Sequence, residues 1–228
     1  MRGKKRETKL SDAQIQSHWD DAADRLLREG HLTRIDGRCP IFYRNNLRFP
    51  LYRYTHKQRA EDFFKEGKLR LTPLLNYRKI ENFNEAIGDK GEGQTNFVTT
   101  KFSYPVGYSV SIRNQLTICL SEDRNDATMM KEFDADCCFR VNSLDFFVSI
   151  NKQIEDRCDS CLIDRVAYIP ASDWAVNLDN HPSGGPLFAG LFKREKHAYQ
   201  KEVRSLWEVK GYSQVVPAIQ ASRPLRPN

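Results

Sequence analysis

The sequence lacks a long apolar stretch. No uninterrupted apolar run in its 228 residues approaches the ~18–20 residues that a membrane-spanning helix needs. The N-terminal segment MRGKKRETKL is basic, but the polar segment SDAQIQSHWD follows it, where a secretory signal would have an apolar core. We therefore expect a cytoplasmic protein that does not associate with a membrane.

The motifs of several common enzyme classes are also missing. The chain has no GxSxG motif, and its Cys and His residues do not form the signature of a cysteine hydrolase. The glycine-rich segment GDKGEG (88–93) lacks the GxxxxGK(S/T) pattern of a phosphate-binding loop. The sequence therefore does not favour a serine or cysteine hydrolase or a P-loop nucleotidase.

The six cysteines do not follow a zinc-binding pattern. Cys158 and Cys161 form one CxxC pair, but Cys137 and Cys138 are adjacent. Two CxxC pairs would be typical of zinc, whereas neighbouring side chains on a strand point to opposite faces and chelate poorly. We expect reduced thiols and no bound metal.

The charge of the chain is positive but mixed. Its 36 basic and 30 acidic residues give a net charge of +6, which favours an anionic partner such as nucleic acid. Residues 1–10 are typical of a solvated, disordered tail and hold five of the basic residues, namely Arg2, Lys4, Lys5, Arg6 and Lys9.

The hydrophobic pattern divides the chain into an N-terminal extension (1–49) and a main domain (50–228). In the extension, the periodicity predicts a helix that starts at Ser11 or Asp12 and stops at Gly30. A turn at Asp36-Gly37 then predicts a hairpin or an extended arm.

The main domain has the pattern of an α+β fold with many short strands. The helices that we expect cover 56–68, 126–133 and 143–158, and 190–199 is a connector or a short helix. The strands that we expect cover 51–55, 69–74, 109–123, 136–142, 165–170 and 200–209, with a further short one within 214–220.

The polar segment 76–106 predicts a long loop, and a loop of that length in a compact domain is functional or disordered. Asp89 and Glu92 lie within it and are flanked by glycines. They could reach a substrate as part of a mobile loop, and the alternative is a plain turn.

Several stretches resemble a known family. The segments LYRY, GKLRLTPLLNYR, IGDKGEG, LTICLSED and YQKEVRSLW occur in this order between about 50 and 208, and they resemble the bacterial DUF2971 family. The run LYRYTHKQRAEDFFKEGKLRLTP is also similar to the opening of ADP-ribosyltransferase folds, with a strand, a basic residue, Thr, a helix, Gly and a strand.

The resemblance implies an ADP-ribosyltransferase-like split β-sandwich with flanking helices and an N-terminal helical extension. It implies NAD+ as co-substrate and a macromolecular acceptor, either nucleic acid or protein. A toxin or phage-defence role, with an antitoxin or regulatory partner, follows by analogy.

The resemblance also implies which residues bind NAD+. Arg53, with Tyr54 and Thr55 beside it, would hold the phosphate or ribose, because a guanidinium is a forked and permanently charged donor. Thr72 would support the nicotinamide side. The chain departs from the family pattern in two places, since LYRYT has no small residue after its Arg and no Ser-Thr-Ser follows the second strand.

In ADP-ribosyltransferases a late strand supplies a catalytic Glu. The resemblance places this residue at Glu202, with Gln200 aimed at the acceptor. Cleavage of the nicotinamide–ribose bond passes through an oxocarbenium-like centre that a carboxylate stabilises. Because strand side chains alternate, Gln200 and Glu202 face one way, and Lys201 and Val203 face the other.

Simpler interpretations of these residues exist. Glu202, which lies between Lys201 and Arg204 in the sequence, could form a cross-strand salt bridge. Arg53 could be a surface ion-pair partner, and Thr72 could be structural. The protein would then be a non-catalytic nucleic-acid- or protein-binding module. A third alternative is an NAD+ glycohydrolase, which uses the same site without an acceptor.

Overall fold

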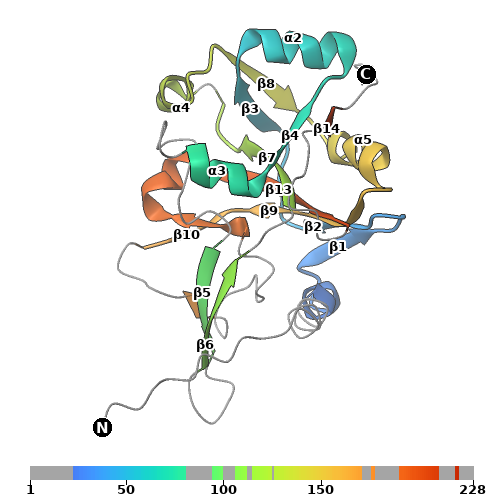
Figure 1. Ribbon diagram of the computed structural model, residues 1–228, viewed down its shortest axis with the longest axis vertical. Helices are drawn as coiled ribbons and strands as arrows, with labels where there is room; N and C mark the ends of the chain where they lie inside the picture. The colour runs from blue at the N-terminus through green and yellow to red at the C-terminus, as the bar shows by residue number, and fades with distance from the viewer. Residues whose placement is uncertain are drawn as a thin grey trace.

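The computed structural model describes residues 23–80, 94–99, 106–111, 115–124, 126–170, 176–177, 190–210 and 219–220. These residues form a mixed α+β structure built on a mostly open sheet of short strands, which confirms the α+β prediction. Figure 1 shows the sheet running through the centre of the molecule with helices on both sides.

The main sheet joins strands that are far apart in the sequence. The order is β1 (Leu32–Ile35), β2 (Ile41–Arg44), β9 (Cys158–Arg165), β13 (Glu202–Val209), β7 (Gln115–Ser121), β3 (Leu51–Thr55) and β8 (Cys137–Val141). Two strands lie off this path: β4 (Arg70–Pro73) pairs with β7, and β14 (Ile219–Gln220) pairs with β4. These pairs are antiparallel except for β2 with β9, which is parallel.

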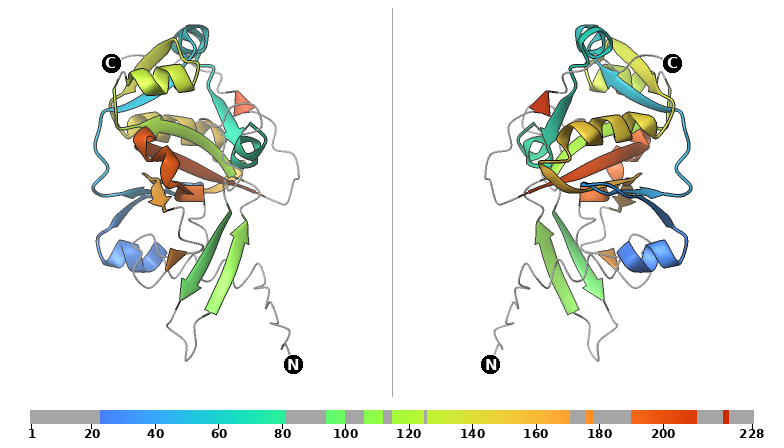
Figure 2. Two further views of the ribbon diagram at one scale, coloured as in Figure 1. Left: turned by 90° about the vertical axis from the view of Figure 1, so that its left-hand side faces the viewer. Right: turned by 90° about the vertical axis from the view of Figure 1, so that its right-hand side faces the viewer.

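Two small sheets flank the main one. The first is a parallel pair of β10 (Ala167–Ile169) and β12 (Phe192–Arg194). The second contains β5 (Gln94–Thr99), β6 (Val106–Ser111) and β11 (Val176–Asn177). Its β5–β6 hairpin projects away from the main sheet, as both views in Figure 2 show.

The helices begin and end where local chemistry favours it. They are residues 23–28, α2 (Lys57–Glu66), α3 (Leu74–Ile80), α4 (Ala127–Glu132), α5 (Asp145–Ile154) and the 3-10 helix η2 (Glu195–Gln200). Gly67 caps α2 in the left-handed region at φ 66°, which confirms the predicted stop. The Asp126 side chain accepts a hydrogen bond from Met129 N–H at the start of α4.

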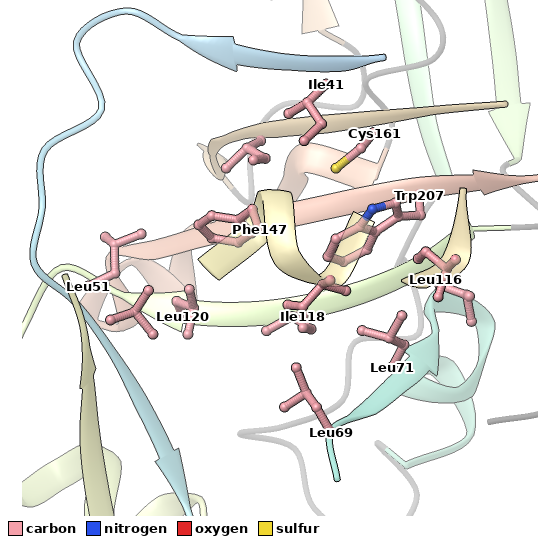
Figure 3. Close-up of a cluster of buried hydrophobic side chains, with 14 of the residues drawn as sticks. Ile41, Leu51, Leu69, Leu71, Leu116, Ile118, Leu120, Phe147, Cys161 and Trp207 are labelled. Atoms are coloured by element: carbon pink, nitrogen blue, oxygen red, sulfur yellow. The ribbon is translucent and has the colours of Figure 1, made fainter. Parts of the chain in front are cut away.

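One face of the main sheet packs against α2 and α5. Phe147 of α5 and Trp207 of β13 lie over Leu116, Ile118 and Leu120 of β7, as Figure 3 shows. Trp207 also donates a hydrogen bond to the α5 residue Asn151 through Nε1 at 3.1 Å, so its polar atom is satisfied within the core.

The opposite face packs against residues 23–28, α3 and the segment before β12. Leu26, Leu74 and Leu191 from these segments form one cluster with two residues of the sheet, Leu162 of β9 and Leu206 of β13. Because strand side chains alternate, the face that carries Leu206 also carries Glu202 and Arg204 of β13.

Buried thiols line the first face where β2 and β9 pair. Cys39, Cys158 and Cys161 are buried there as free thiols. Burial raises the pKa of Cys39 to about 11 and of Cys158 to about 12, so both are protonated at neutral pH. No group of three or more metal-ligating side chains comes together in the described part of the chain. Within these residues, no helix has the length and apolarity to span a membrane.

The structure corrects the sequence prediction for 143–170. The expected helix 143–158 ends earlier, with α5 at Ile154, and the unexpected strand β9 begins at Cys158. A register shift between Glu208 and Val209 places Cys158 and Cys161 on one face, so strict alternation is lost. The parallel pairing of β9 with β2 also joins the predicted β1–β2 hairpin to the main sheet.

Three further expectations differ from the structure. The segment 76–106 contains the end of α3 and all of β5, so it is not one continuous loop. The expected strand 109–123 is divided into β6 and β7, with residues 112–114 outside the described part. The strand expected at 200–209 begins at Glu202, because Gln200 ends η2.

Candidate functional site

Glu202 is the first residue of β13 and is only 4% exposed. Its backbone is held at the junction of β9 and β10. The N–H of Glu202 donates to Tyr168 Oη at 2.9 Å, and its carbonyl accepts from Val166 N–H at 2.8 Å. These two bonds fix where the side chain leaves the strand.

Each carboxylate oxygen of Glu202 faces a buried cation. Nε and Nη2 of Arg204 both lie 2.9 Å from Oε1, and Lys193 Nζ lies 2.8 Å from Oε2. Arg204 is 1% exposed and Lys193 is 5% exposed. A buried charge is tolerated only with such partners, which explains how the sheet holds a carboxylate here.

The surroundings of Glu202 keep it ionised. Burial alone would raise the pKa of this carboxyl group. The nearby charges of Arg204 and Lys193 outweigh burial and lower the pKa to about 2. At neutral pH, Glu202 is therefore a fixed negative charge and a hydrogen-bond acceptor.

Gln200 reaches the same group from a different element than expected. It lies at the end of η2, and Lys201 follows with φ 40°, a left-handed turn into β13. The prediction that Gln200 and Glu202 share a strand face, with Lys201 and Val203 on the other, is therefore wrong. Lys193 nevertheless connects their side chains, because its Nζ donates to Gln200 Oε1 at 2.9 Å and lies 2.8 Å from Glu202 Oε2.

The edge of β7 is forked, and Arg53 lies in the fork. Leu116 and Thr117 of β7 pair with β4, whereas Ser121 pairs with Tyr52 of β3. Between these two pairings, the Cys119 carbonyl accepts a hydrogen bond from Arg53 Nη1 at 3.2 Å.

Cys119 links Arg53 to Glu202. Its thiol donates to Tyr77 Oη of α3 at 3.7 Å and lies close enough to the Glu202 carboxylate for that charge to act on it. Burial, and then the charge of Glu202, raise the pKa of Cys119 to about 11, so the thiol keeps its proton. The two residues expected at opposite ends of an NAD+ site thus both lie near Cys119, Arg53 at its carbonyl and Glu202 on the side of its thiol.

The other residues expected in the NAD+ site lie farther from Glu202 or outside the described part of the chain. Thr72 of β4 pairs with Thr117, and Thr55 ends β3 opposite Cys137. Tyr54 donates to the Asp123 carbonyl at 2.8 Å and accepts from Asp126 N–H at 2.9 Å, which ties β3 to the start of α4 and not to Glu202. The remaining expected pair, Asp89 and Glu92, lies outside the described residues.

Sequence reasoning missed Lys193 and Tyr168 and treated Arg204 only as a flanking charge. Lys193 and Tyr168 carry no sequence signal of their own, because they depend on the β10–β12 pairing. Arg204 does have one, since it lies two residues after Glu202 and so shares its strand face.

Arg204 also fixes the segment before β12. Its Nη1 donates to the carbonyl of Gly190. A Cβ at Gly190 would lie 2.8 Å from Leu206 Cδ1 and 3.0 Å from Gln115 Oε1, so a larger residue would require these side-chain ends to move.

Polar side chains continue across four strands on this face. Asp164 of β9 pairs with Arg204 and accepts hydrogen bonds from Arg44 Nε and Nη2 at 2.9 and 2.6 Å. Cys119 is the partner of Arg204 on β7. The cross-strand row therefore runs through Cys119, Arg204, Asp164 and Arg44, with Glu202 beside it.

Thr117 predicts a stabilising substitution. Its Oγ1 is buried, with the residue 1% exposed, and finds no hydrogen-bond partner within the described structure. Because a buried unpaired hydroxyl costs about 1–3 kcal/mol, Thr117→Val is expected to raise the free energy of unfolding by about 1 kcal/mol in urea denaturation. As the control, Ser121→Ala should lower it, because Ser121 Oγ donates to the Gln200 carbonyl at 2.7 Å. A loss of stability in Thr117→Val would contradict the interpretation that the buried Thr117 hydroxyl has no hydrogen-bond partner.

Comparisons of the chain with protein-family models, with curated proteins and with solved structures each found no match. The chemistry of the site is therefore argued from its own residues. Among the described residues, these are an ionised carboxylate between two cations, a guanidinium in the fork of β7, and the neutral hydroxyl or thiol groups of Tyr168, Tyr77 and Cys119.

Proposed function

We propose that the protein is an NAD+-dependent ADP-ribosyltransferase whose catalytic residue is Glu202. The observation that carries this proposal is the arrangement of Arg53 and Glu202 around Cys119. Arg53 donates to the Cys119 carbonyl, and Arg204, the partner of Cys119 on β13, donates to Glu202. The forked edge of β7 supports the ADP-ribosyltransferase-like split sheet that the resemblance implies, because β3 and β4 diverge from one strand.

The ionisation of Glu202 suits cleavage of the nicotinamide–ribose bond. The bond electrons leave with nicotinamide, and positive charge develops at the ribose carbon. A carboxylate held ionised stabilises that charge without gaining or losing a proton. The acceptor then bonds to the ribose carbon and releases its own proton.

Arg53 suits the phosphates of NAD+. A guanidinium offers five N–H donors in a planar fork that matches phosphate oxygens, and the bond to the Cys119 carbonyl fixes its position. NAD+ would then lie with its phosphates at the fork of β7 and its ribose toward β13. The net charge of +6 favours nucleic acid as the acceptor, with protein as the alternative. A role as a toxin or phage-defence effector, with an antitoxin or regulatory partner, fits this activity by analogy.

A turnover assay tests the proposal. Incubation of the full chain with labelled NAD+ and either nucleic acid or cell extract should release nicotinamide and label a macromolecule. Glu202→Gln keeps the shape of the side chain but removes its charge, and we expect a loss of about 10²–10³-fold in the rate of release. Glu195→Gln is the control, because Glu195 is exposed on η2.

The possible outcomes separate the candidate functions. Equal rates in wild type and Glu202→Gln would contradict the role of Glu202. Nicotinamide release without a labelled acceptor would indicate an NAD+ glycohydrolase. Nucleic-acid or protein binding without NAD+ binding or turnover would indicate a non-catalytic binding module.

A further inference from the structure

Lys193 contacts both polar side chains of the candidate site. It lies on β12, and its single ammonium group is 2.9 Å from Gln200 Oε1 and 2.8 Å from Glu202 Oε2. The residue is 5% exposed, so these contacts are made away from bulk water. Away from water, the hydrogen bond to Gln200 and the ion pair with Glu202 are both stronger than they would be on the surface.

The fold fixes where Lys193 lies. Its strand β12 pairs in parallel with β10, and the register places Lys193 opposite Tyr168. Tyr168 accepts the backbone N–H of Glu202, so the β10–β12 pair holds Glu202 at two points. One point is the backbone, through Tyr168, and the other is the carboxylate, through Lys193.

Lys193 also decides which way the Gln200 amide faces. An ammonium group only donates hydrogen bonds, so it selects the carbonyl oxygen of the amide and not the nitrogen. Gln200 Nε2 is then directed toward Tyr199 Oη at 3.3 Å and His197 Nδ1 at 3.5 Å. Without the ammonium, the broad terminal torsion of a Gln side chain would allow the opposite orientation.

The groups that face Glu202 come from five elements. They are Arg204 on β13, Lys193 on β12, Cys119 on β7, Tyr168 on β10 and Tyr77 on α3. Two of the five are cations, and burial raises the pKa of the two Tyr hydroxyls and of the Cys119 thiol. Among these five residues, Arg204 and Lys193 therefore supply the positive charge that balances the Glu202 carboxylate.

We propose that Lys193 is a positioning residue, whose one ammonium group bridges Gln200 and Glu202 and sets the direction in which both present their polar atoms to the substrate. The inference rests on the proposed NAD+ chemistry for its effect on rate. The bridge itself is a property of the protein without substrate, and it can be measured separately.

Turnover tests the effect on rate. In Lys193→Met the aliphatic volume is kept and the charge is lost, and kcat for nicotinamide release should fall about 10²-fold, the cost of a misplaced reacting group, while KM for NAD+ changes little. Lys193→Arg restores the charge and should recover part of the loss. The exposed residue Lys196 on η2 provides the control, and Lys196→Met should behave as wild type.

Carboxyl ¹³C NMR tests the bridge without NAD+. The Glu202 signal is assigned by its absence in Glu202→Gln. Its titration midpoint, at a pKa of about 2 in the wild type, should rise by ~1–3 units in Lys193→Met, because one nearby cation is lost. The Gln200 side-chain amide should also lose its single fixed environment. If Lys193→Met does not fold, Lys193→Gln keeps the hydrogen-bonding shape and serves in its place.

The two measurements distinguish two failures. Wild type without NAD+ turnover would contradict the proposed function, while the NMR results would still decide whether Lys193 holds Glu202 and Gln200. Turnover in wild type, combined with an unchanged midpoint, amide signal and kcat in Lys193→Met, would overturn the positioning role and leave the proposed function standing.

Discussion

Arg204→Met is expected to lower the free energy of unfolding by about 3–5 kcal/mol, the usual cost of removing one partner of a buried ion pair. Arg204 is 1% exposed and donates to both Glu202 and the Gly190 carbonyl. Its loss leaves Oε1 of a buried carboxylate without its cation and the carbonyl without its guanidinium donor. Urea denaturation at pH 7 measures the change.

A surface ion pair next to this site provides the control. Lys201 pairs with Asp123 at 2.8 Å, and the Lys201 side chain is exposed, so Lys201→Met should cost far less stability than Arg204→Met. Equal losses of unfolding free energy in Arg204→Met and Lys201→Met would show that the buried pair stabilises the protein no more than the surface pair does.

Acidification is expected to destabilise the wild type relative to Glu202→Gln. Although burial alone would raise it, the pKa of Glu202 is lowered from 4.5 to about 2 by Arg204 and Lys193. Because the folded-state pKa is depressed, the stabilisation is complete above pH 4.5 and is lost as the pH falls through about 2. The total is roughly 3 kcal/mol, since one pKa unit corresponds to about 1.4 kcal/mol.

Paired denaturation curves measure this loss. The difference in unfolding free energy between wild type and Glu202→Gln should be constant above about pH 5 and should decrease by up to about 1.4 kcal/mol per pH unit below it. Subtracting the variant cancels the titration of the other carboxyl groups, which both proteins share. A difference that does not change with pH would mean that Glu202 has an ordinary pKa in the folded protein.

Much of the local structure follows from the sequence. The spacing of Ala60 and Phe63 and the glycine at 67 predict α2, and Asp126 marks the start of α4. The expected strand 51–55 is β3, with the same bounds. These elements are predictable because their signals are local: a cap, a stop, or a short β-branched or aromatic run.

The site is only partly predictable, because its contacts are not local. Gln200 and Glu202 were identified, but the left-handed turn at Lys201 separates them into a 3-10 helix and a strand. No glycine or asparagine marks that turn. Strand β9 was missed because it is buried on both faces and contains a register shift, so its residues do not alternate. Lys193 joins the site only through the β10–β12 pairing.

The central position of β13 has a consequence for how the chain acquires its structure during synthesis. β13 pairs with β7 on one side and β9 on the other, yet among the described strands only β14 follows it in the sequence. Until residues 202–209 have left the ribosome, β7 and β9 each keep one open edge, and the charges that later meet at Glu202 remain in water. The nascent protein therefore completes its sheet and its candidate site in the same step, when β13 is added, and the open edges of β7 and β9 need protection until then.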